Sequence, residues 1–577
     1  MKKKLLPALI VTGLIILVVI IMGITALINK YTPTKKTEDL KEYFNISSDD
    51  EVALIVNNEL SDYKAKIIDK KIYVDYKFVH DSLNSRFYWD ANENVLLYTT
   101  ASDIISAAAD SNSYSVTKQT NDFGYPIVKA TSDSALIALD YVKQYSNITF
   151  KSYDDPARIV ITSKWDEIDS ATVSKSTQVR VKGGIKSPIL KEVEKDDKIT
   201  ILDSGDKWDK VATEDGVIGY IKRKALSESK KTKLTNPDYE EETFTHIKKD
   251  KDICLAWNQV TSQSANSKVP QVISSTKGIN VISPTWFYLN DNNGNLADIA
   301  SKDYVSYCHS QGIEVWGLFS NLENTDVDAA YVLTHTSTRT TLINQIMSAA
   351  FNYELDGVNI DFENITEAAY GDSYIEFIRE LSIKCHNNGI SLSVDVTVPA
   401  SFNKFFNRSD MAKFADYIVI MGYDEHYKGS DAGSVSSIPW VTEGVESTLK
   451  EVPADQIILG MPFYTRIWEL TPKEDDDAVT DTEDQSKYTV ASQVYSMDAA
   501  AAQLATNNAT AALDEKSGQN YAEWSASNKL YKVWLEDSTS LEKRLKLVDD
   551  NKLAGAAFWK LGFENSSVWD TVIKYLD

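Results

Sequence analysis

The sequence predicts a multidomain chain whose largest part is an α/β barrel of the (β/α)8 (TIM-barrel) type. Small β-rich domains and an N-terminal transmembrane helix are expected before it. Three observations predict this: an uncharged apolar run near the N-terminus, short alternating segments over residues 49–226, and β-rich runs alternating with amphipathic stretches over residues 244–577. A chain of 577 residues is too long for one hydrophobic core.

The composition limits the class of protein. The formal net charge is -24, which argues against a nucleic-acid partner because nucleic acids bind basic surfaces. The 30 tyrosines and 12 tryptophans suit contacts with sugar rings, although most are expected in cores. Cys254, Cys308 and Cys385 form no disulfide or metal pattern, and we expect buried free thiols.

The N-terminus is predicted to be a membrane anchor. Lysines 2–4 precede a run of 24 residues without charge, Leu5 to Ile28. A membrane span needs about 20 residues, whereas a secretory signal has an apolar stretch of only about 7–15. Residues 1–30 are therefore expected to be a cytoplasmic tip and a signal anchor, with the rest of the chain outside the membrane. Cleavage and secretion are the alternative. Residues 31–48 are polar and predict a stalk.

An internal repeat organises residues 49–165. Residues 71–100 align with residues 134–163 at a constant offset of 63, and each copy predicts strand, short helix, strand, turn, strand. The pattern resembles the copper amine oxidase N-terminal-like module of bacterial wall proteins, which implies a spacer or a binding unit. No copper site is expected, because His80 is the only histidine in the segment.

Residues 174–226 predict a second, all-β unit. Its strand-like runs lie at residues 177–181, 198–202, 207–211 and 216–221. Their order and residues resemble a bacterial SH3 domain, and this resemblance implies binding to the bacterial cell wall. Trp208 is a candidate either for the binding groove or for the core. Residues 227–243 are charged and contain Pro237, which indicates a linker.

Eight β-rich runs predict the barrel over residues 244–577. They lie at residues 253–257, 281–284, 315–319, 358–363, 392–396, 417–421, 457–461 and 556–559. Amphipathic stretches such as residues 373–387 lie between them. The active site of such a barrel lies at the C-terminal ends of its strands. The long gap before the eighth run predicts an inserted α+β element over residues 471–540, beginning with the acidic run Glu474 to Asp477.

The fourth run carries the candidate catalytic groups. Apolar and polar residues alternate along it, so one face presents Asn359, Asp361 and Glu363. Glu363 at the tip is placed to protonate a glycosidic oxygen, and Asp361 lies about 6–7 Å deeper. A nearby carboxylate raises the pKa of such an acid and keeps it protonated near neutral pH. On the residues alone, a solvent-exposed acidic strand end or a metal site also fits.

Three motifs resemble glycoside hydrolase family 18, the chitinase-like barrels. The family signature D-x-x-D-x-D-x-E is matched by Asp356, Asn359, Asp361 and Glu363. The M-x-Y-D motif after the sixth strand and the tryptophan after the eighth are matched by Met421, Tyr423, Asp424 and Trp559. The resemblance covers roughly residues 244–577, with the three motifs in the family's order.

This resemblance implies substrate-assisted catalysis with retention at the anomeric carbon. Glu363 would act as acid and then base, Asp361 would orient the substrate's N-acetyl group, and Tyr423 would hydrogen-bond it. Asp424 would position Tyr423 or the sugar, with a helix N-cap as the alternative. Trp559 would floor the cleft under the sugar ring, or else belong to the barrel core.

Further residues are candidates with two interpretations each. Met421 belongs to the M-x-Y-D motif and is expected at the substrate site. Trp286 and Trp468, after the second and seventh strands, fit either a cleft or a core. Glu536 and Asp537 lie in a stretch that resembles the peptidoglycan-lytic branch of the family, and they fit either a cleft or an acidic surface.

Asn359 departs from the pattern, since many chitinases have Asp there. An amide cannot share a proton with Asp361, and the change favours the spore-cortex and peptidoglycan-lytic N-acetylglucosaminidase branch. We therefore expect a membrane-anchored hydrolase of β-1,4-linked N-acetylglucosamine in wall glycan, with no metal or cofactor. The alternatives are a non-catalytic wall-binding protein with a degenerate barrel, a chitinase, or an endo-N-acetylglucosaminidase.

Overall fold

The computed structural model describes residues 5–365, 368–473 and 484–576. Lysines 2–4 and the acidic run Glu474 to Asp477 lie outside the described residues. The chain divides into two compact units. The first comprises Met1–Trp89, Ala107–Tyr114 and Asn121–Glu241, and the second comprises Asp90–Ser106, Ser115–Thr120 and Glu242–Asp577.

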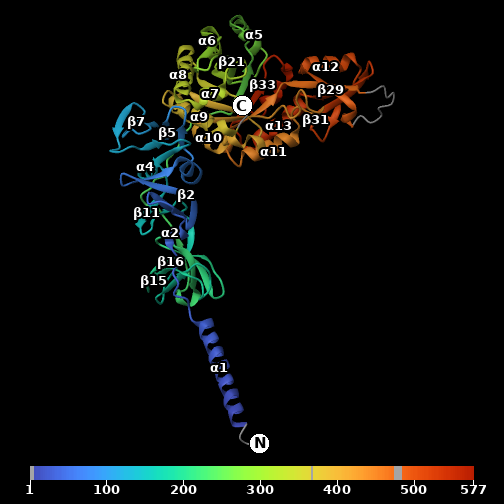
Figure 1. The fold of residues 1–577 in the computed structure, drawn as a ribbon. Coiled ribbons are helices and arrows are strands. Elements are labelled where there is room, and N and C mark those ends of the chain that lie inside the picture. The colour runs from blue at the N-terminus through green and yellow to red at the C-terminus, as the bar shows by residue number, and fades with distance from the viewer. Residues whose placement is uncertain (1–4, 366–367, 474–483, 577) are drawn as a thin grey trace. The chain divides into compact units, whose positions relative to one another are not determined.

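The first unit begins with an apolar helix, α1 (Leu5–Tyr31; Figure 1). Its segment Leu9–Tyr31 is 23 residues long with a mean hydropathy of 2.9, so it is long and apolar enough to cross a membrane. The next residues pack more closely than a polar stalk would. Helix α2 (Leu40–Tyr43) begins after Asp39, and the adjacent Phe44 is fully buried in the core of the first unit.

The two repeat copies have the predicted order of strand, helix, strand, turn and strand. The first copy comprises β3 (Lys71–Asp75), α3 (Tyr76–Phe78), a π-helical turn (Val79–Leu83), β4 (Phe87–Asp90) and β5 (Val95–Thr99). The second comprises β10 (Ala135–Ala138), α4 (Leu139–Tyr145), β11 (Thr149–Asp154) and β12 (Ala157–Thr162). Strands β3 and β10 pair antiparallel, with Val74 opposite Ile137. These two residues are equivalent at the offset of 63, so a local two-fold axis passes between them.

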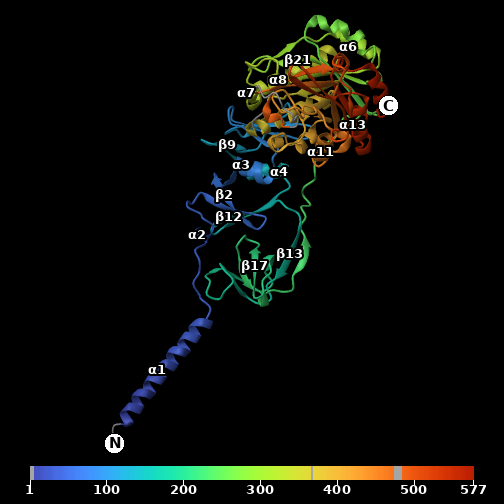
Figure 2. The same cartoon turned by 90° about the vertical axis from the view of Figure 1, so that its right-hand side faces the viewer.

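Two seven-stranded sheets form the rest of the first unit. One has the order β11-β12-β1-β2-β3-β10-β9, in which the strands not yet named are β1 (Glu51–Val56), β2 (Glu59–Ile68) and β9 (Val128–Ala130). The other has the order β15-β14-β18-β17-β16-β13-β19 (Figure 2). Its strands are β13 (Glu167–Thr172), β14 (Thr177–Arg180), β15 (Ile189–Val193), β16 (Lys198–Asp203), β17 (Trp208–Thr213), β18 (Ile218–Lys222) and β19 (Lys230–Lys233).

The four strand-like runs predicted in the second sheet are strands in the structure. Strand β19 lies where the sequence predicts a linker. It pairs antiparallel with β13, and Lys231 contacts Asp169 at 3.1 Å. All four β19 residues are exposed, so no apolar face marks the strand in the sequence.

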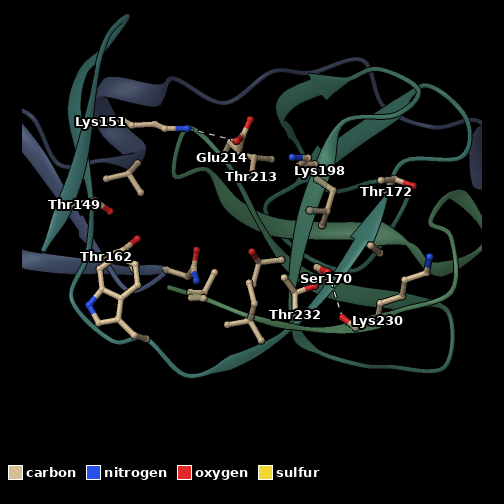
Figure 3. A pocket seen from close by; sticks show the side chains of 18 of the residues that line it. Thr149, Lys151, Thr162, Ser170, Thr172, Lys198, Thr213, Glu214, Lys230 and Thr232 are labelled. Atoms are coloured by element: carbon tan, nitrogen blue, oxygen red, sulfur yellow. Dashed lines mark hydrogen bonds and ion pairs between the residues drawn. The ribbon is translucent and has the colours of Figure 1, made fainter. Parts of the chain in front are cut away.

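A cleft of about 600 Å³ lies within the first unit, between β11–β12 and the face of β13, β16 and β19 (Figure 3). Hydroxyl groups such as those of Thr149, Thr162 and Ser170 line it, and Lys151 contacts Glu214 at 3.5 Å across it. The two sheets that form its walls share a hydrophobic core, in which Ile55 of β1 packs with Val217. The cleft therefore has walls that are held together.

Eight parallel strands of the second unit close into the predicted barrel (Figure 1). In chain order they are β20 (Ile253–Asn258), β21 (Val281–Leu289), β23 (Glu314–Ser320), β24 (Gly357–Asp361), β25 (Ser391–Thr397), β26 (Tyr417–Met421), β27 (Ile457–Pro462) and β33 (Gly555–Trp559). Pairing of β20 with both β21 and β33 completes the ring. All eight predicted strands are confirmed, and the three cysteines are buried free thiols, as expected.

Helices surround the barrel. They are α5 (Val269–Ile273), α6 (Lys302–Ser310), α7 (Ala329–Thr334), α8 (Thr336–Tyr353), α9 (Gly371–His386), α10 (Arg408–Phe414), α11 (Ile438–Thr448), α13 (Ser538–Asn551) and α14 (Trp569–Val572). A short strand, β22 (Leu296–Asp298), pairs antiparallel with the end of β21.

The predicted insertion forms a lobe beside the barrel (Figure 1). Its five-stranded sheet has the order β29-β28-β32-β31-β30. The elements are β28 (Tyr464–Pro472), β29 (Tyr488–Ser496), α12 (Met497–Thr506), β30 (Ala512–Asp514), β31 (Gln519–Ala526) and β32 (Lys529–Leu535). The lobe follows β27 directly, so its first strand starts at the mouth of the barrel.

A segment from the repeat region belongs to the barrel unit. Strands β4 and β5 continue into β6 (Ile104–Ala108), β7 (Ser113–Val116) and β8 (Gln119–Asp122), which form one five-stranded sheet. Asp90 Oδ2 accepts hydrogen bonds from the amide and hydroxyl of Thr336, the first residue of α8, at 2.7 and 2.6 Å. Thr99 donates a hydrogen bond of 2.8 Å to the fully buried Glu376 of α9. Residues 90–106 therefore cover part of the outer helices of the barrel.

Candidate active site

The fourth barrel strand is fixed at its start. Helix α8 ends at Glu354, whose left-handed backbone (φ 57°) turns the chain toward β24. Asp356 then accepts a hydrogen bond from the Val315 amide and is hydrogen-bonded to His309 Nε2, both at 2.8 Å. The first Asp of the sequence signature therefore anchors the amino end of β24, at the opposite end of the strand from the site.

Asp361 ends β24, and Glu363 follows just beyond it. The intervening Phe362 is buried against the rings of Tyr374 and Phe377, with ring centroids 6.3 and 5.6 Å away. Alternation along the extended chain turns the two acids the other way, into the barrel mouth. Glu363 is open to solvent at the mouth. The Oδ1 atom of Asp361 is shielded from solvent and has no hydrogen-bond partner among the described residues.

Both acids are held toward the protonated form. Burial raises the pKa of Asp361 well above its ordinary value, and the charges of Asp395, Glu363 and Glu323 raise it further. Burial also raises the pKa of Glu363, and the negative charges of Asp424 and then Glu323 raise it further. Part of the raised pKa of Glu363 thus comes from Glu323 and Asp424, which lie on the loops after β23 and β26.

Asn359 lies inside the barrel, two residues below Asp361, and is completely buried. Its Oδ1 accepts hydrogen bonds from Trp257 Nε1 at 3.0 Å and from Ser283 Oγ at 2.9 Å. Its Nδ2 donates to Ser393 Oγ at 3.0 Å and to Asp395 Oδ1 at 2.7 Å. Both ends of the amide are therefore satisfied by protein, and Asn359 belongs to the buried interior of the barrel rather than to its open mouth.

Tyr423 reaches the same region from the end of β26. Its ring packs edge-to-face on Trp257 and on Tyr464, with centroid distances of 6.5 and 6.3 Å. Gly460 leaves room for it, since a Cβ there would lie 3.3 Å from the Tyr423 ring. Burial raises the pKa of Tyr423 well above its ordinary value, and nearby charges beginning with Asp361 add to this, so its hydroxyl stays a proton donor.

Asp424 contacts the inserted lobe instead of capping a helix. It has a left-handed backbone (φ 62°) and accepts a hydrogen bond of 2.5 Å from Tyr464 Oη. Arg466 Nη2 lies 3.7 Å from its Oδ1. Tyr464 also packs on Tyr423, so Asp424 is linked to Tyr423 through this ring.

Trp559 and Met421 lie at the ends of β33 and β26. Trp559 is half-buried, and its ring packs edge-to-face on Trp257 at 6.0 Å. The part of Trp559 that is open remains available to a sugar ring. Met421 is almost buried, with 8 % of its surface exposed, and is mainly a wall residue.

Two of the candidate tryptophans lie in cores. Trp286 is fully buried and donates a hydrogen bond of 2.7 Å to Asn266. It packs on Tyr304, so it cannot line a substrate cleft in this structure. Trp468 is buried in the inserted lobe and donates to the Gly433 carbonyl at 2.8 Å. In both cases the core interpretation is the one that the structure supports.

Glu536 and Asp537 have structural contacts. Glu536 is buried and paired with Arg544 at 2.5 Å, and burial raises its pKa to about 7 against the opposing effect of that arginine. Asp537 caps helix α13 by accepting from the amides of Thr539 and Ser540. Glu536 is therefore a buried, paired acid and not a surface acid.

Sequence reasoning missed the second buried acid, Asp395 of β25. Burial raises its pKa well above the ordinary value, in spite of the hydrogen bond from Asn359. The signal was present, because Ser391, Ser393 and Asp395 alternate with apolar residues as the polar face of β24 does. Glu323 was also missed. It follows β23 and accepts a hydrogen bond from Ser320.

Comparison with known proteins identifies the region. Residues 324–564 match the family model described as glycosyl hydrolases family 18. The chain is 23% identical over 348 residues to the uncharacterized glycosylase YvbX of Bacillus subtilis (strain 168), covering 56% of this chain and 95% of that protein.

Two further similarities agree with this match. The chain is 25% identical over 287 residues to the cortical fragment-lytic enzyme of Bacillus subtilis (strain 168), covering 48% of this chain and 63% of the relative. A solved C-terminal domain from Desulfitobacterium hafniense DCB-2 aligns with a TM-score of 0.50 at 18% identity, covering 57% of this chain and all of that domain. The structural likeness concerns the fold.

Proposed function

Since the chain carries a family 18 glycosidase domain, we propose that it cleaves β-1,4-linked N-acetylglucosamine in the peptidoglycan of bacterial cell walls. One observation carries this proposal. Asp361 at the end of β24 and Glu363 two residues beyond it are joined at the mouth by Tyr423, whose pKa is raised by burial and then by charges that include Asp361 and Glu363. The three groups required for substrate-assisted cleavage thus lie in one small volume.

The first half of the reaction breaks the glycosidic bond. Glu363 gives its proton to the glycosidic oxygen, which leaves from the anomeric carbon. The carbonyl oxygen of the substrate's own N-acetyl group bonds to that carbon from the opposite face. Asp361 stabilises the positive charge that develops on the amide nitrogen, and the Tyr423 hydroxyl holds the N-acetyl group by a hydrogen bond.

The second half restores both the sugar and the enzyme. Glu363, now a carboxylate, takes a proton from water, and the water oxygen bonds to the anomeric carbon as the ring formed by the N-acetyl group opens. Two inversions give net retention. Trp559, at the end of β33, would lie under the sugar ring, and aromatic faces suit this role.

The proposed substrate and the proposed location of the protein are supported by different observations. A relative is named for lysis of cortical fragments, which favours a wall glycan over chitin. Helix α1 would be an uncleaved signal anchor, with the repeat region and the SH3-like unit holding the barrel near the wall. Fractionation of expressing cells tests this anchor, because a cleaved chain would appear in the medium without residues 1–30.

The decisive experiment uses the full chain purified in detergent, with peptidoglycan, chitin oligomers and N-glycans as substrates. We expect new reducing ends from peptidoglycan, and mass spectrometry should identify them as N-acetylglucosamine. The Glu363→Gln variant should lose this activity with an unchanged thermal transition, because Gln keeps the shape but has no proton to give. NMR of the first product should give the β-anomer. Absence of cleavage on all three substrates would instead support a wall-binding protein.

A further inference from the structure

We propose that Asp395 is the carboxyl partner of Asp361, that the two share one proton, and that Asn359 is the fixed donor that orients Asp395. This inference rests on the proposed glycosidase function. The two acids of the pair, Asp361 and Asp395, then lie on neighbouring strands. A pair along one strand would instead use positions 359 and 361 of β24. Asp395 is then a positioning residue, because it acts on the substrate through Asp361.

The strand register brings the two acids together. Strands β24 and β25 are parallel neighbours, with Asn359 opposite Ser393 and Ile360 opposite Val394. The next pair in this register is Asp361 and Asp395. Neighbouring strands lie about 4.8 Å apart, and residues of the same parity point to the same side of the sheet. Both carboxyl groups therefore enter the barrel interior side by side.

The orientation of the Asn359 amide is fixed by its neighbours. An indole N–H can only donate, so the atom that faces Trp257 Nε1 at 3.0 Å must be the amide oxygen. The amide nitrogen therefore faces Asp395 Oδ1 at 2.7 Å and needs an unprotonated acceptor there. Because of this hydrogen bond, a proton held by the pair has two places, the second oxygen of Asp395 or the carboxyl of Asp361.

Burial makes sharing of a proton necessary. Two adjacent carboxyl groups in an interior cannot both ionise without a large cost. The titratable groups that face them also include Glu363 after β24, Glu323 after β23, Tyr374 on α9 and Tyr423 after β26, none of which is cationic. Asp361 Oδ1 is buried without a partner among the described residues, which leaves an oxygen ready to take the proton or to meet the substrate.

The pair has a defined part in the reaction. When the substrate's N-acetyl group reaches Asp361, the shared proton moves to the free oxygen of Asp395. Asp361 then carries the negative charge that the developing cation needs, and Asp395 is neutral. The proton returns when the product leaves, so atoms and charge balance over the cycle.

The test is an exchange of the acid and the amide between the two strands. Asp395→Asn removes the partner and should lower kcat about 100-fold, the scale of a lost proton-transfer partner. KM should change by less than about threefold, because Asp395 does not touch the substrate. The double variant Asn359→Asp/Asp395→Asn keeps one acid and one amide in the same hydrogen bond and should recover kcat to within about tenfold. Recovery of this kind is not expected if Asp395 only fills space.

Two controls separate this inference from the proposed function. Ser391→Ala changes another buried residue of β25 and should leave kcat and the pH profile unchanged. Wild-type activity and its loss in Glu363→Gln decide the function without reference to Asp395. An Asp395→Asn variant with the kcat and pH profile of the wild type, or an exchanged variant no better than Asp395→Asn, would overturn the shared-proton pair.

A second measurement does not depend on activity. The pKa values of both acids are raised in the folded state, so their contribution to stability is complete below the ordinary pKa of about 4 and is lost as the pH rises through the raised values. Asp395→Asn should therefore raise the melting temperature at pH 8 relative to the wild type and leave it almost unchanged at pH 4. Equal shifts at both pH values would contradict the pair even in a chain that cleaves nothing.

Discussion

The carboxylate of Asp424 links the candidate active site of the barrel to the inserted lobe. It accepts a hydrogen bond from Tyr464 Oη at 2.5 Å, and its charge is the first neighbour, after burial, to raise the pKa of Glu363. The proposed acid, Glu363, works only while protonated, so we expect this charge to contribute to the upper pH limit of activity. The exposed Asp424 thus raises the pKa of Glu363 without a hydrogen bond to it.

Replacing Asp424 with Asn should move the alkaline limb of the kcat–pH profile to lower pH. The variant keeps an oxygen that accepts from Tyr464, but it removes a negative charge that raises the pKa of Glu363. Rates on a soluble oligosaccharide across the pH range measure the shift. Asp550→Asn on the outer helix α13 is the control, and it should leave the limb in place. A limb that moves upward in Asp424→Asn would refute this assignment.

At the scale of single elements, helix α9 is unusual because it is buried on nearly all sides. Its Arg379 contacts Glu376 at 3.0 Å and Asp410 of α10. The two carboxylates raise the pKa of Arg379 against the effect of burial, and Arg379 lowers the pKa of Asp410 although burial opposes this. Charges in such a place depend on each other, since removal of Arg379 leaves Glu376 buried without this cation and leaves Asp410 with the half-exposed Lys413 at 3.4 Å.

We expect Arg379→Leu to destabilise the barrel unit by about 3–5 kcal/mol, because Glu376 and Asp410 lose their common partner. Calorimetry of the full chain at pH 7 measures the change. Lys546→Ala breaks an exposed pair with Asp550 on α13 and should cost far less, because solvent screens this pair. A similar small cost for Arg379→Leu would mean that the buried pairs add no net stability.

The elements that the sequence reveals are those with an apolar face. The eight barrel strands carry buried runs of Val, Ile and Leu, so their positions could be predicted. Strand β19 has four polar, exposed residues, and only its pairing with β13 makes it a strand. For the site, Glu363 and Asp361 stand out within one strand. Alternation along β25 marks Asp395 as an inward-facing polar residue, but its pairing with Asp361 becomes visible only when the two strands are placed in register, because the two residues lie 34 positions apart.

At the scale of the whole molecule, residues 90–106 come from the repeat region of the sequence but belong to the barrel unit. Asp90 satisfies the first amide of helix α8, and Thr99 covers Glu376 of α9. The first amides of a helix have no partner within the helix, so a side chain from another segment can supply one. The outer face of the barrel is therefore completed by residues that precede their partners, Thr336 and Glu376, by more than 200 positions.

Asp90→Ala should lower the stability of the barrel unit by about 1 kcal/mol, the usual cost of a lost helix cap. Asp90→Asn keeps an acceptor for Thr336 and is the matched control. Its loss of stability should be only a few tenths of the loss in Asp90→Ala. Hydrogen exchange of the first turn of α8 should rise in the Ala variant only. Identical hydrogen exchange in both variants would show that Asp90 does not stabilise the first turn of α8.

The pairing of Val74 with Ile137 has a consequence for the history of the chain. Equivalent residues of the two copies lie opposite each other, which is the contact that two separate copies of a shorter protein would make across a two-fold axis. Gene duplication and fusion turn such a homodimer into one chain while keeping the contact. The pairing of β3 with β10 therefore has the geometry of a dimer contact kept within a single polypeptide, and once two such copies are joined their sequences are free to diverge.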